Sequence, residues 1–156
     1  MNNIIYAGNS LGKRFYRYYK IANNLRHIPF LGGVFSILYR AWTHLHGIHI
    51  PLQTQIGKDF VIWHGEGIVI NGGTKIGDRV TMRPNTVLGS AKHGGGCPTI
   101  LDGVDIGTNC VIIGEVTVGK EAVVGAGSVV VKDVPDYAVV VGNPAHVVNY
   151  RKPSLL

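Results

Sequence analysis

The sequence is short of charged residues, cysteines and long apolar runs. Only 15% of its 156 residues are charged and 46% are hydrophobic, which excludes a disordered chain, because such chains combine high charge with low hydrophobicity. Its two cysteines are too few for a disulfide framework. No apolar run reaches the roughly 18 residues of a membrane-spanning helix, and Met1-Asn2-Asn3 does not begin a secretory signal. We therefore expect one folded domain in the cytoplasm.

Acidic residues are also scarce, with nine Asp and Glu against fifteen Lys and Arg, which gives a formal net charge of +6. Much of the excess lies before Leu52. The basic residues there are Lys13, Arg14, Arg17, Lys20, Arg26 and Arg40, and they alternate with Phe15, Tyr16, Tyr18 and Tyr19. Such a segment suits a solvated helix face, a polyphosphate ligand or peripheral contact with an anionic membrane. In the last case the protein would lie at the inner face of the membrane. Nucleic acid is not expected, because no DNA- or RNA-binding motif accompanies the charge.

Glycine, by contrast, is abundant, and the sequence repeats every six residues between positions 105 and 130. Every sixth residue is apolar, and the fourth residue after it is small. The apolar positions are Ile106, Ile112, Val118, Val124 and Val130, and the small ones are Cys110, Val116, Ala122 and Ser128. Neither the helix period of about 3.6 nor the strand period of about 2 gives this spacing. Three short strands per turn give it directly, so we predict an all-β fold, a parallel β-helix of hexapeptide repeats.

The same register continues backward through the chain. Leu88 and Ile100 keep it across the segment SAKHGGGCPT, so residues 89–99 are predicted to leave the coil as a loop. A sandwich of ordinary strands is disfavoured, because its side chains alternate and do not repeat every six residues.

In the first part of the coil the register is shifted by two residues. The shifted apolar positions are Ile56, Ile62 and Ile68, and the unshifted ones that follow are Ile76 and Met82. We assign this offset to the turn at residues 71–73, where an asparagine precedes two glycines.

Residues 10–45 are predicted to form two short helices that lead into the coil and cap its open end. Asn9-Ser10 is a helix start signal, and residues 28–33 contain a proline and two glycines that interrupt the helical pattern. The sequence thus divides into a short N-terminal helical segment at residues 1–47, the β-helix at residues 48–150 and a C-terminal tail at residues 151–156.

The clearest candidate for chemistry is the motif WHGEG at residues 63–67. His64 falls on or near a turn, and a solenoid interior has no room for an imidazole, so we expect its side chain to face outward. The flanking glycines let a ligand approach the backbone closely, although a surface histidine without function fits the same pattern. The glycine-rich loop that ends at Cys97 suits a mobile lid or a plain flexible connection.

Together these motifs resemble the hexapeptide-repeat acetyltransferases of the serine acetyltransferase type. The resemblance covers about residues 36–148 and rests on WHGEGIVI, on the loop that closes on CPTI, and on the run from IGTNC to GNPAHVV. The sequence is especially similar to the colanic acid acetyltransferase branch, which decorates bacterial exopolysaccharides. The resemblance implies a left-handed β-helix, a homotrimer with active sites between subunits, acetyl-CoA as donor and an O-acetylated hydroxyl as product. Left-handedness rests on the resemblance alone, because ordinary crossovers are right-handed.

By position, His64 matches the catalytic histidine of this family. A neutral imidazole can take the proton from an acceptor hydroxyl as the oxygen attacks the thioester carbonyl, and can then give it to the leaving thiolate. A backbone N–H or a donor such as Asn85 is expected to hold the oxyanion. In serine acetyltransferases an acid at the position of His49 orients the histidine, so Glu66 or a group from the next subunit is expected to do so here.

Cys97 is a second departure from serine acetyltransferases, which have a serine-binding histidine at this position. The exopolysaccharide branch shares the Cys-Pro pair, and serine acetyltransferases also carry a much larger helical domain before the coils. We therefore expect the acceptor to be a sugar hydroxyl in an exopolysaccharide or its precursor. Serine O-acetylation in cysteine biosynthesis is the alternative.

The resemblance also implies that CoA lies along a groove between coils and is bound by backbone groups. The matching positions are Ser90, Thr108 and Ala126, with Gly125, Gly127 and Asn143 close by. Backbone donors suit phosphates and the pantetheine amide, since they lose no side-chain entropy on binding. The motif GAGS is also what an ordinary coil corner requires, so the pattern alone does not distinguish the two roles.

Three other functions are compatible with parts of the sequence. Cys97 as an acyl-accepting nucleophile would give ping-pong kinetics. His44, His46 and His49 form an H-x-H-x-x-H cluster, but it precedes the first coil and lacks the spacing of zinc ligands on stacked hexads, so we expect no metal. A scaffold without activity would leave the outward-facing His64 unexplained.

Overall fold

The computed structural model describes residues 10–152; Asn9 of the predicted start signal and residues 153–156 of the predicted tail lie outside this range. Within it, two helices precede fifteen short strands. The helices are α1 (Ser10–Leu25) and α2 (Leu31–Leu45), and the strands are β1 (Ile48–His49), β2 (Gln55–Ile56), β3 (Val61–Ile62), β4 (Ile68–Ile70), β5 (Lys75–Ile76), β6 (Thr81–Met82), β7 (Val87–Gly89), β8 (Thr99–Ile100), β9 (Asp105–Ile106), β10 (Val111–Ile113), β11 (Thr117–Val118), β12 (Val123–Val124), β13 (Val129–Val130), β14 (Ala138–Gly142) and β15 (Ala145–Tyr150). Neither of these two helices is long and apolar enough to cross a membrane.

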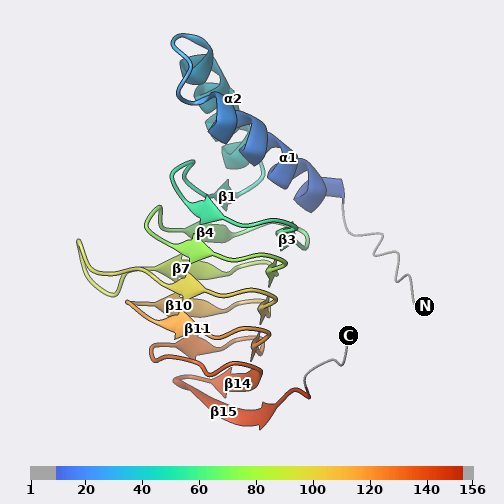
Figure 1. Cartoon of the computed structure of the whole chain (residues 1–156), viewed down its shortest axis with the longest axis vertical. Coiled ribbons are helices and arrows are strands. Elements are labelled where there is room, and N and C mark those ends of the chain that lie inside the picture. The colour runs from blue at the N-terminus through green and yellow to red at the C-terminus, as the bar shows by residue number, and fades with distance from the viewer. Residues whose placement is uncertain (1–9, 153–156) are drawn as a thin grey trace.

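The strands form three sheets that stack coil upon coil along one axis (Figure 1). Sheet A contains β1, β4, β7, β10 and β13, sheet B contains β2, β5, β8 and β11, and sheet C contains β3, β6, β9, β12, β14 and β15. Up to β13, every third strand along the chain returns to the same sheet and pairs in parallel with its predecessor. The predicted parallel β-solenoid with two preceding helices is therefore confirmed.

The interior consists of columns in which apolar side chains of successive coils stack on one another. In sheet C the strand pairings join Ile62 to Met82, Met82 to Ile106 and Ile106 to Val124. All four side chains are at most 2% exposed. Burial of one such side chain stabilises a fold by about 1.5–3 kcal/mol relative to leaving it in water, so these columns hold the coils together.

The two-residue offset, however, was assigned to the wrong turn. Ile70 pairs with Leu88 and is therefore the column residue of sheet A. Ile62 and Ile70 lie eight residues apart, whereas Met82 and Leu88, which follow them in the next coil, lie six apart. The two extra residues consequently lie between Ile62 and Ile70 and not at residues 71–73.

The helices close the first coil, as predicted (Figure 1). An end coil has no neighbour on its outer side, and a buried carbonyl without a donor is costly. Tyrosine hydroxyls supply the donors: Tyr16 bonds the Gly57 carbonyl at 2.7 Å, Tyr19 the Thr54 carbonyl at 2.5 Å and Tyr39 the Ile50 carbonyl at 2.7 Å. Burial raises the pKa of the Tyr39 hydroxyl above its ordinary value, so this group stays protonated and able to donate.

The interruption between the helices is shorter than the sequence predicts. Because α2 begins at Leu31, Gly32 and Gly33 lie inside the helix and not in the break. A Cβ at Gly32 would lie 2.5 Å from the carbonyl oxygen of Arg26. Gly32 is therefore required for the close approach of α2 to the end of α1, and it does not act as a helix breaker.

The opposite end of the coil closes by a reversal of chain direction that the sequence did not predict. β14 pairs in parallel with β12, but β15 turns back and pairs antiparallel to β14. The reversal uses the turn at residues 143–144, within the predicted β-helix.

The longest connection inside the coil is the segment between β7 and β8, residues 90–98. Figure 1 shows it as a yellow loop that projects from one edge of the solenoid. Column residues Leu88 and Ile100 stay in register on either side, because Leu88 pairs with Ile112 and Ile100 with Val118.

Tyr39→Phe is expected to lower the free energy of unfolding by about 1–3 kcal/mol, because the Ile50 carbonyl then loses its donor in a buried setting. Urea unfolding monitored by circular dichroism measures the change. Tyr150→Phe is the matched control, since Tyr150 is 56% exposed, and should change stability by less than about 0.5 kcal/mol. Equal effects of the two substitutions would contradict the capping role.

Candidate functional site

Most of the predicted site residues lie along one edge of the solenoid, where the chain passes from sheet C to sheet A. We name this edge the CA corner, and it comprises residues 63–67, 83–86, 107–110 and 125–128 in four successive coils. The predicted residues on it are His64, Glu66, Asn85, Thr108, Gly125, Ala126 and Gly127. Residues up to 63 positions apart in the sequence, His64 and Gly127, thus share one edge because the coils are in register.

The two extra residues of the first coil lie in the CA corner itself. The Trp63 N–H donates to the Met82 carbonyl at 2.9 Å, and the Asn85 N–H donates to the Glu66 carbonyl at 3.0 Å. In a parallel ladder these two bonds align Trp63 with Arg83 and Glu66 with Pro84, so the first coil has two residues, 64 and 65, where the next coil has none. The WHGEG motif is therefore an enlarged corner.

His64 lies at the middle of a tight turn in this corner. The Gly65 N–H donates to the Trp63 carbonyl at 2.8 Å, which closes a three-residue turn around His64. The φ angle of His64 is 65°, a value that few residues other than glycine adopt. Its side chain is exposed, as the sequence predicts. Seven other non-glycine residues of the described chain also have a positive φ, among them Asp59 and Arg79 at other corners of the coil. This conformation is therefore a general feature of the coil turns and does not by itself mark His64.

Asn85 lies in the next coil directly against the turn that carries Glu66. Gly67 has a φ of 68°, and a Cβ there would lie 2.1 Å from the Asn85 Oδ1 atom. Glycine is thus required at position 67 both by its backbone conformation and by the contact. Glu66 and Asn85 are both exposed, so their polar groups face the same solvent as the imidazole of His64.

Farther along the CA corner, two predicted residues already use polar groups within the coil. The Thr108 hydroxyl donates to the Pro84 carbonyl at 3.0 Å, and the Gly127 N–H donates to the Thr108 carbonyl at 2.9 Å. Ala126 is exposed beside them, and a Cβ at Gly127 would meet no atom within 4 Å. Gly127 therefore leaves open space on the corner, while its N–H is committed to the coil.

Asn143 lies near the end of the same corner. A Cβ at Gly125 would lie 2.6 Å from the Cγ1 atom of Val141, so the two coils touch there. The turn that contains Asn143 follows Val141 by two residues, and Asn143 is exposed. The structure thus adds Asn143 to the set of residues gathered at this edge.

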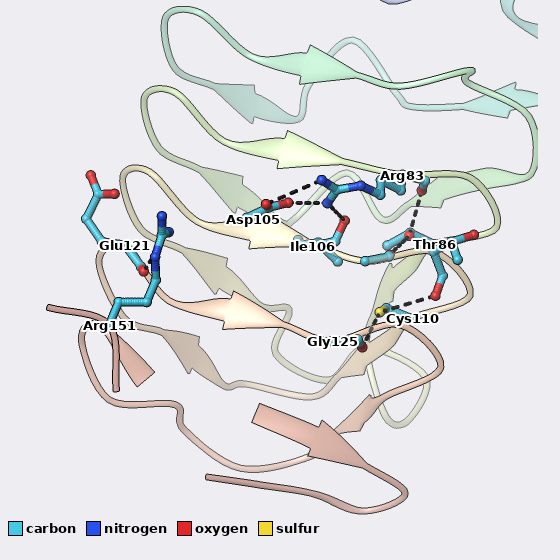
Figure 2. A network of polar contacts seen from close by, with 10 residues as sticks. Arg83, Thr86, Asp105, Ile106, Cys110, Glu121, Gly125 and Arg151 are labelled. Atoms are coloured by element: carbon cyan, nitrogen blue, oxygen red, sulfur yellow. Dashed lines mark hydrogen bonds and ion pairs between the residues drawn. The ribbon is translucent and has the colours of Figure 1, made fainter. Parts of the chain in front are cut away.

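Small polar side chains inside the coil fix the carbonyl groups of the corner (Figure 2). Thr86 donates to the Gly107 carbonyl at 3.2 Å, and Cys110 and Ser128 donate to the Gly125 carbonyl at 3.2 and 2.6 Å. Burial raises the pKa of the Cys110 thiol. Cys110 therefore remains a protonated donor and a poor nucleophile.

The sequence analysis did not single out Arg83, a cation at the start of the corner in the second coil. Its guanidinium pairs with the Asp105 carboxylate and donates to the Ile106 carbonyl at 3.3 Å (Figure 2). Both side chains of the ion pair are more than one-third exposed, so solvent weakens the pairing. Asp105 lies beside Arg83 because β6 and β9 pair Thr81 with Asp105. This register depends on the length of the loop at residues 90–98, which the sequence alone does not reveal.

Three predicted residues lie away from the CA corner. His49 is exposed on β1 of sheet A, whereas Ser90 and Cys97 lie on the opposite edge of that sheet, where the chain passes to sheet B. A shallow hollow of about 370 Å³ joins His49 with Ser90, and a Cβ at Gly73 would lie 3.1 Å from the Cys97 Sγ atom. The strands of sheet A lie between these two edges, so sheet A separates Cys97 from His64 within one chain.

The histidines near the first coil do not form a metal site. Across residues 10–152, no group of three or more His, Cys, Asp or Glu side chains is arranged to hold a metal ion. His46 instead contacts Trp42, with its Nδ1 atom 2.7 Å from the Trp42 carbonyl oxygen and the two rings 4.4 Å apart between centroids.

Comparison with known sequences identifies several acetyltransferases. Over 125 residues the chain is 44% identical to the serine acetyltransferase of Bacillus pumilus, and this match covers 79% of the chain and 56% of that enzyme. Over 129 residues it is 40% identical to a protein of Escherichia coli described as a colanic acid biosynthesis acetyltransferase, WcaB, covering 81% of the chain and 76% of that protein. The chain thus spans little more than half of the first relative and three quarters of the second. No protein-family model matches the chain.

Solved structures give the same result for the fold. A serine acetyltransferase of Neisseria gonorrhoeae in complex with serine superimposes with a TM-score of 0.77 at 30% identity, over 86% of this chain and 56% of that one. A serine acetyltransferase in complex with CoA gives a TM-score of 0.75 at 29% identity, over 86% and 55%. Such neighbours are left-handed β-helices, so the predicted left-handed fold is confirmed.

Proposed function

The chain belongs to the hexapeptide-repeat acetyltransferases of the serine acetyltransferase type, and we propose that it moves an acetyl group from acetyl-CoA to a hydroxyl of a sugar. The expected acceptor is an exopolysaccharide or its precursor. One observation carries this proposal above the others: the family's catalytic histidine corresponds to His64, an exposed residue at the middle of a tight turn in the enlarged CA corner.

In the proposed reaction, His64 acts as general base. Its imidazole takes the proton of the acceptor hydroxyl while the hydroxyl oxygen bonds to the thioester carbonyl carbon. When the tetrahedral intermediate collapses, the carbon–sulfur bond breaks and the imidazolium returns the proton to the thiolate of CoA. The products are an O-acetyl ester and CoA, and the imidazole is restored.

Asn85 is the proposed donor to the oxyanion of this intermediate. Its backbone N–H already donates to the Glu66 carbonyl, so the side-chain amide is the group that remains for a ligand. Glu66 is our candidate for orienting His64, because both belong to the same exposed corner and position 49 holds a histidine and not an acid. Both assignments concern side chains at the solvent-facing surface, where an acceptor can reach them.

Acetyl-CoA is proposed to lie along the CA corner below His64. Coil packing leaves open space at Gly127 and exposes Ala126, which suits the narrow pantetheine chain. Since the Gly127 N–H is bonded within the coil, Gly127 contributes room for the cofactor and not a donor. Thr108 and Asn143 lie on either side of these residues along the corner. Ser90 lies across sheet A, so we propose that it contacts the cofactor of a neighbouring subunit.

We propose a homotrimer in which sheet A faces neighbouring subunits. His49 pairs with Val69 on its outer surface, and the row continues through Val87, Val111 and Val129. Val69 is 42% exposed, and burial of such a valine row favours association. Within one chain sheet A separates Cys97 from His64. In the trimer, Cys97 of one subunit would lie near His64 of its neighbour.

Sedimentation equilibrium at micromolar concentration tests this assembly. We expect a mass about three times the chain mass of 16.8 kDa. A mass near that of a single chain would contradict the trimer.

An acceptor panel tests the function itself. The release of CoA thiol from acetyl-CoA is measured with serine, nucleotide sugars and oligosaccharides, and we expect the highest kcat/KM with a sugar. Serine O-acetylation is the second candidate, because 44% identity links the chain to a serine acetyltransferase. A kcat/KM for serine higher than for every sugar would establish that alternative.

His64→Ala is expected to lower kcat by about two to four orders of magnitude, because one positioned proton-transfer group is lost. The affinity for CoA should change little. Cys97→Ala is the matched comparison and should alter the KM for the acceptor more than kcat, since we assign it to the acceptor pocket. If Cys97→Ala is inactive, His64→Ala is nearly normal and acetylated enzyme accumulates without acceptor, covalent transfer through Cys97 replaces the direct mechanism.

Ala126→Tyr is expected to abolish the thermal protection given by acetyl-CoA, because the larger side chain fills the proposed groove. The measurement is the shift in Tm on adding acetyl-CoA to each protein. Val148→Tyr is a suitable control, since Val148 is 52% exposed on β15 and lies outside both the CA corner and sheet A. Unchanged protection in Ala126→Tyr would move the cofactor site elsewhere.

A further inference from the structure

The solvent side of α2 carries a continuous apolar stripe that no described residue covers. Its large members are Phe30, Leu31, Val34, Ile37, Leu38 and Leu45, which are 41–85% exposed. The buried residues of the helix, Gly32, Tyr39 and Thr43, recur at helical spacing on the opposite side, against α1 and the first coil. Scattered exposed apolar residues are ordinary, but a row of six large ones along one helix marks an interaction surface.

The formal net charge of the protein lies in the same segment. Residues 1–57 contain six Lys and Arg and no Asp or Glu, whereas residues 58–156 contain nine of each. Six minus zero and nine minus nine give +6 and zero, so the helical segment accounts for the whole charge of +6. Among these basic residues Arg14, Arg17, Lys20, Arg26 and Arg40 are exposed.

These cations have few partners within the protein. The two ion pairs found in residues 10–152, Arg79 with Glu121 and Arg83 with Asp105, both belong to the coil. In the helical segment, Lys20 lies over the Tyr16 ring, 5.6 Å from its centroid, and Arg26 donates to the Leu52 carbonyl at 3.2 Å. Neither contact neutralises the charge, so the segment presents apolar and cationic groups together.

We infer that α2 docks on the surface of an anionic lipid bilayer, with its apolar stripe in the interface and the basic residues of α1 and α2 near the lipid phosphates. An exposed apolar stripe in a helical segment whose charged residues are all Lys and Arg suits such a surface. α2 lies in the plane of this interface and does not span the bilayer, since neither described helix is long and apolar enough to do so.

A second copy of the chain fits this surface less well. Contact between two α2 stripes would bring together two segments of charge +6 that contain no acid to offset the repulsion. An anionic lipid surface supplies the negative charge that balances the helical segment. The coil cannot balance it, because residues 58–156 have a net charge of zero.

The position of the helices also suits a flat partner. They form one end of the solenoid (Figure 1), so the stripe does not compete with sheet A for a neighbour. If the chain forms the proposed trimer, its three copies of α2 lie at the same end of the assembly, and a membrane could bind all three at once. α1 also lies against the coil next to the proposed site, because a Cβ at Gly12 would lie 1.9 Å from the Ile62 carbonyl oxygen.

Vesicle flotation of the full chain, without acetyl-CoA or acceptor, tests the inference independently of the proposed reaction. We expect binding to phosphatidylcholine vesicles that contain phosphatidylglycerol, and binding at least about tenfold weaker to phosphatidylcholine alone. Added salt should weaken binding to the anionic vesicles, because it screens the charges. Absence of binding to the anionic vesicles would overturn the inference.

The variant Ile37→Asp with Leu45→Asp should bind the anionic vesicles at least about tenfold more weakly. Val147→Asp with Val148→Asp is the matched control, since those valines are 40% and 52% exposed on β15, and it should bind like the wild type. Circular dichroism melting verifies that both variants are folded. If the α2 variant binds the anionic vesicles like the wild type, the inference is refuted. If in addition its sedimentation mass falls, the stripe is a contact between copies of the chain.

Discussion

The hydrogen bonds between successive coils are the interaction on which the whole structure depends. Each coil offers N–H and C=O groups along its two faces, and the neighbouring coils satisfy them at 2.7–3.1 Å, as in the bond from Val61 to Val80. This arrangement works only in the middle of the stack. The ends need other partners, and the chain supplies them with tyrosine hydroxyls at the first coil and with the antiparallel strand β15 at the last. The helical segment is thus part of the fold and not an appendage to it.

Keeping every coil in register leaves little freedom for chemistry on the sheet faces, where a change of length would displace the interior columns. The corners tolerate extra residues, because the chain there already leaves the ladder. The two extra residues among positions 64–66 are accommodated while Ile62 and Ile70 keep their columns. The proposed catalytic histidine therefore lies on a local enlargement, and buried donors such as Cys110 hold the corner carbonyls farther along. Rigidity comes from the coil and reactivity from its edge.

The interior could be predicted from the sequence because one apolar residue in every six must face inward, and residues 105–130 show that spacing. The location of the offset could not, because Ile68 and Ile70 are both buried and either one fits the spacing. His64 was recognised through its motif and its outward position, but the bond that brings Asn85 against Glu66 depends on pairing between coils. Gly32 was misread for a similar reason, since its requirement comes from the carbonyl of Arg26 in the turn after α1.

The reversal at β15 also has a consequence for how solenoids of this kind behave in a crowded solution. A parallel coil that ended with an open edge would offer a template on which the first coil of another molecule could continue the stack into a fibre. The antiparallel strand breaks that geometry, because the edge it exposes has the wrong direction and register for another coil, and Arg151 and Lys152 follow it with positive charge. With α1 and α2 covering the opposite end, growth along the axis is hindered at the first coil and along sheet C of the last coil, by the same elements that complete the hydrogen bonding there.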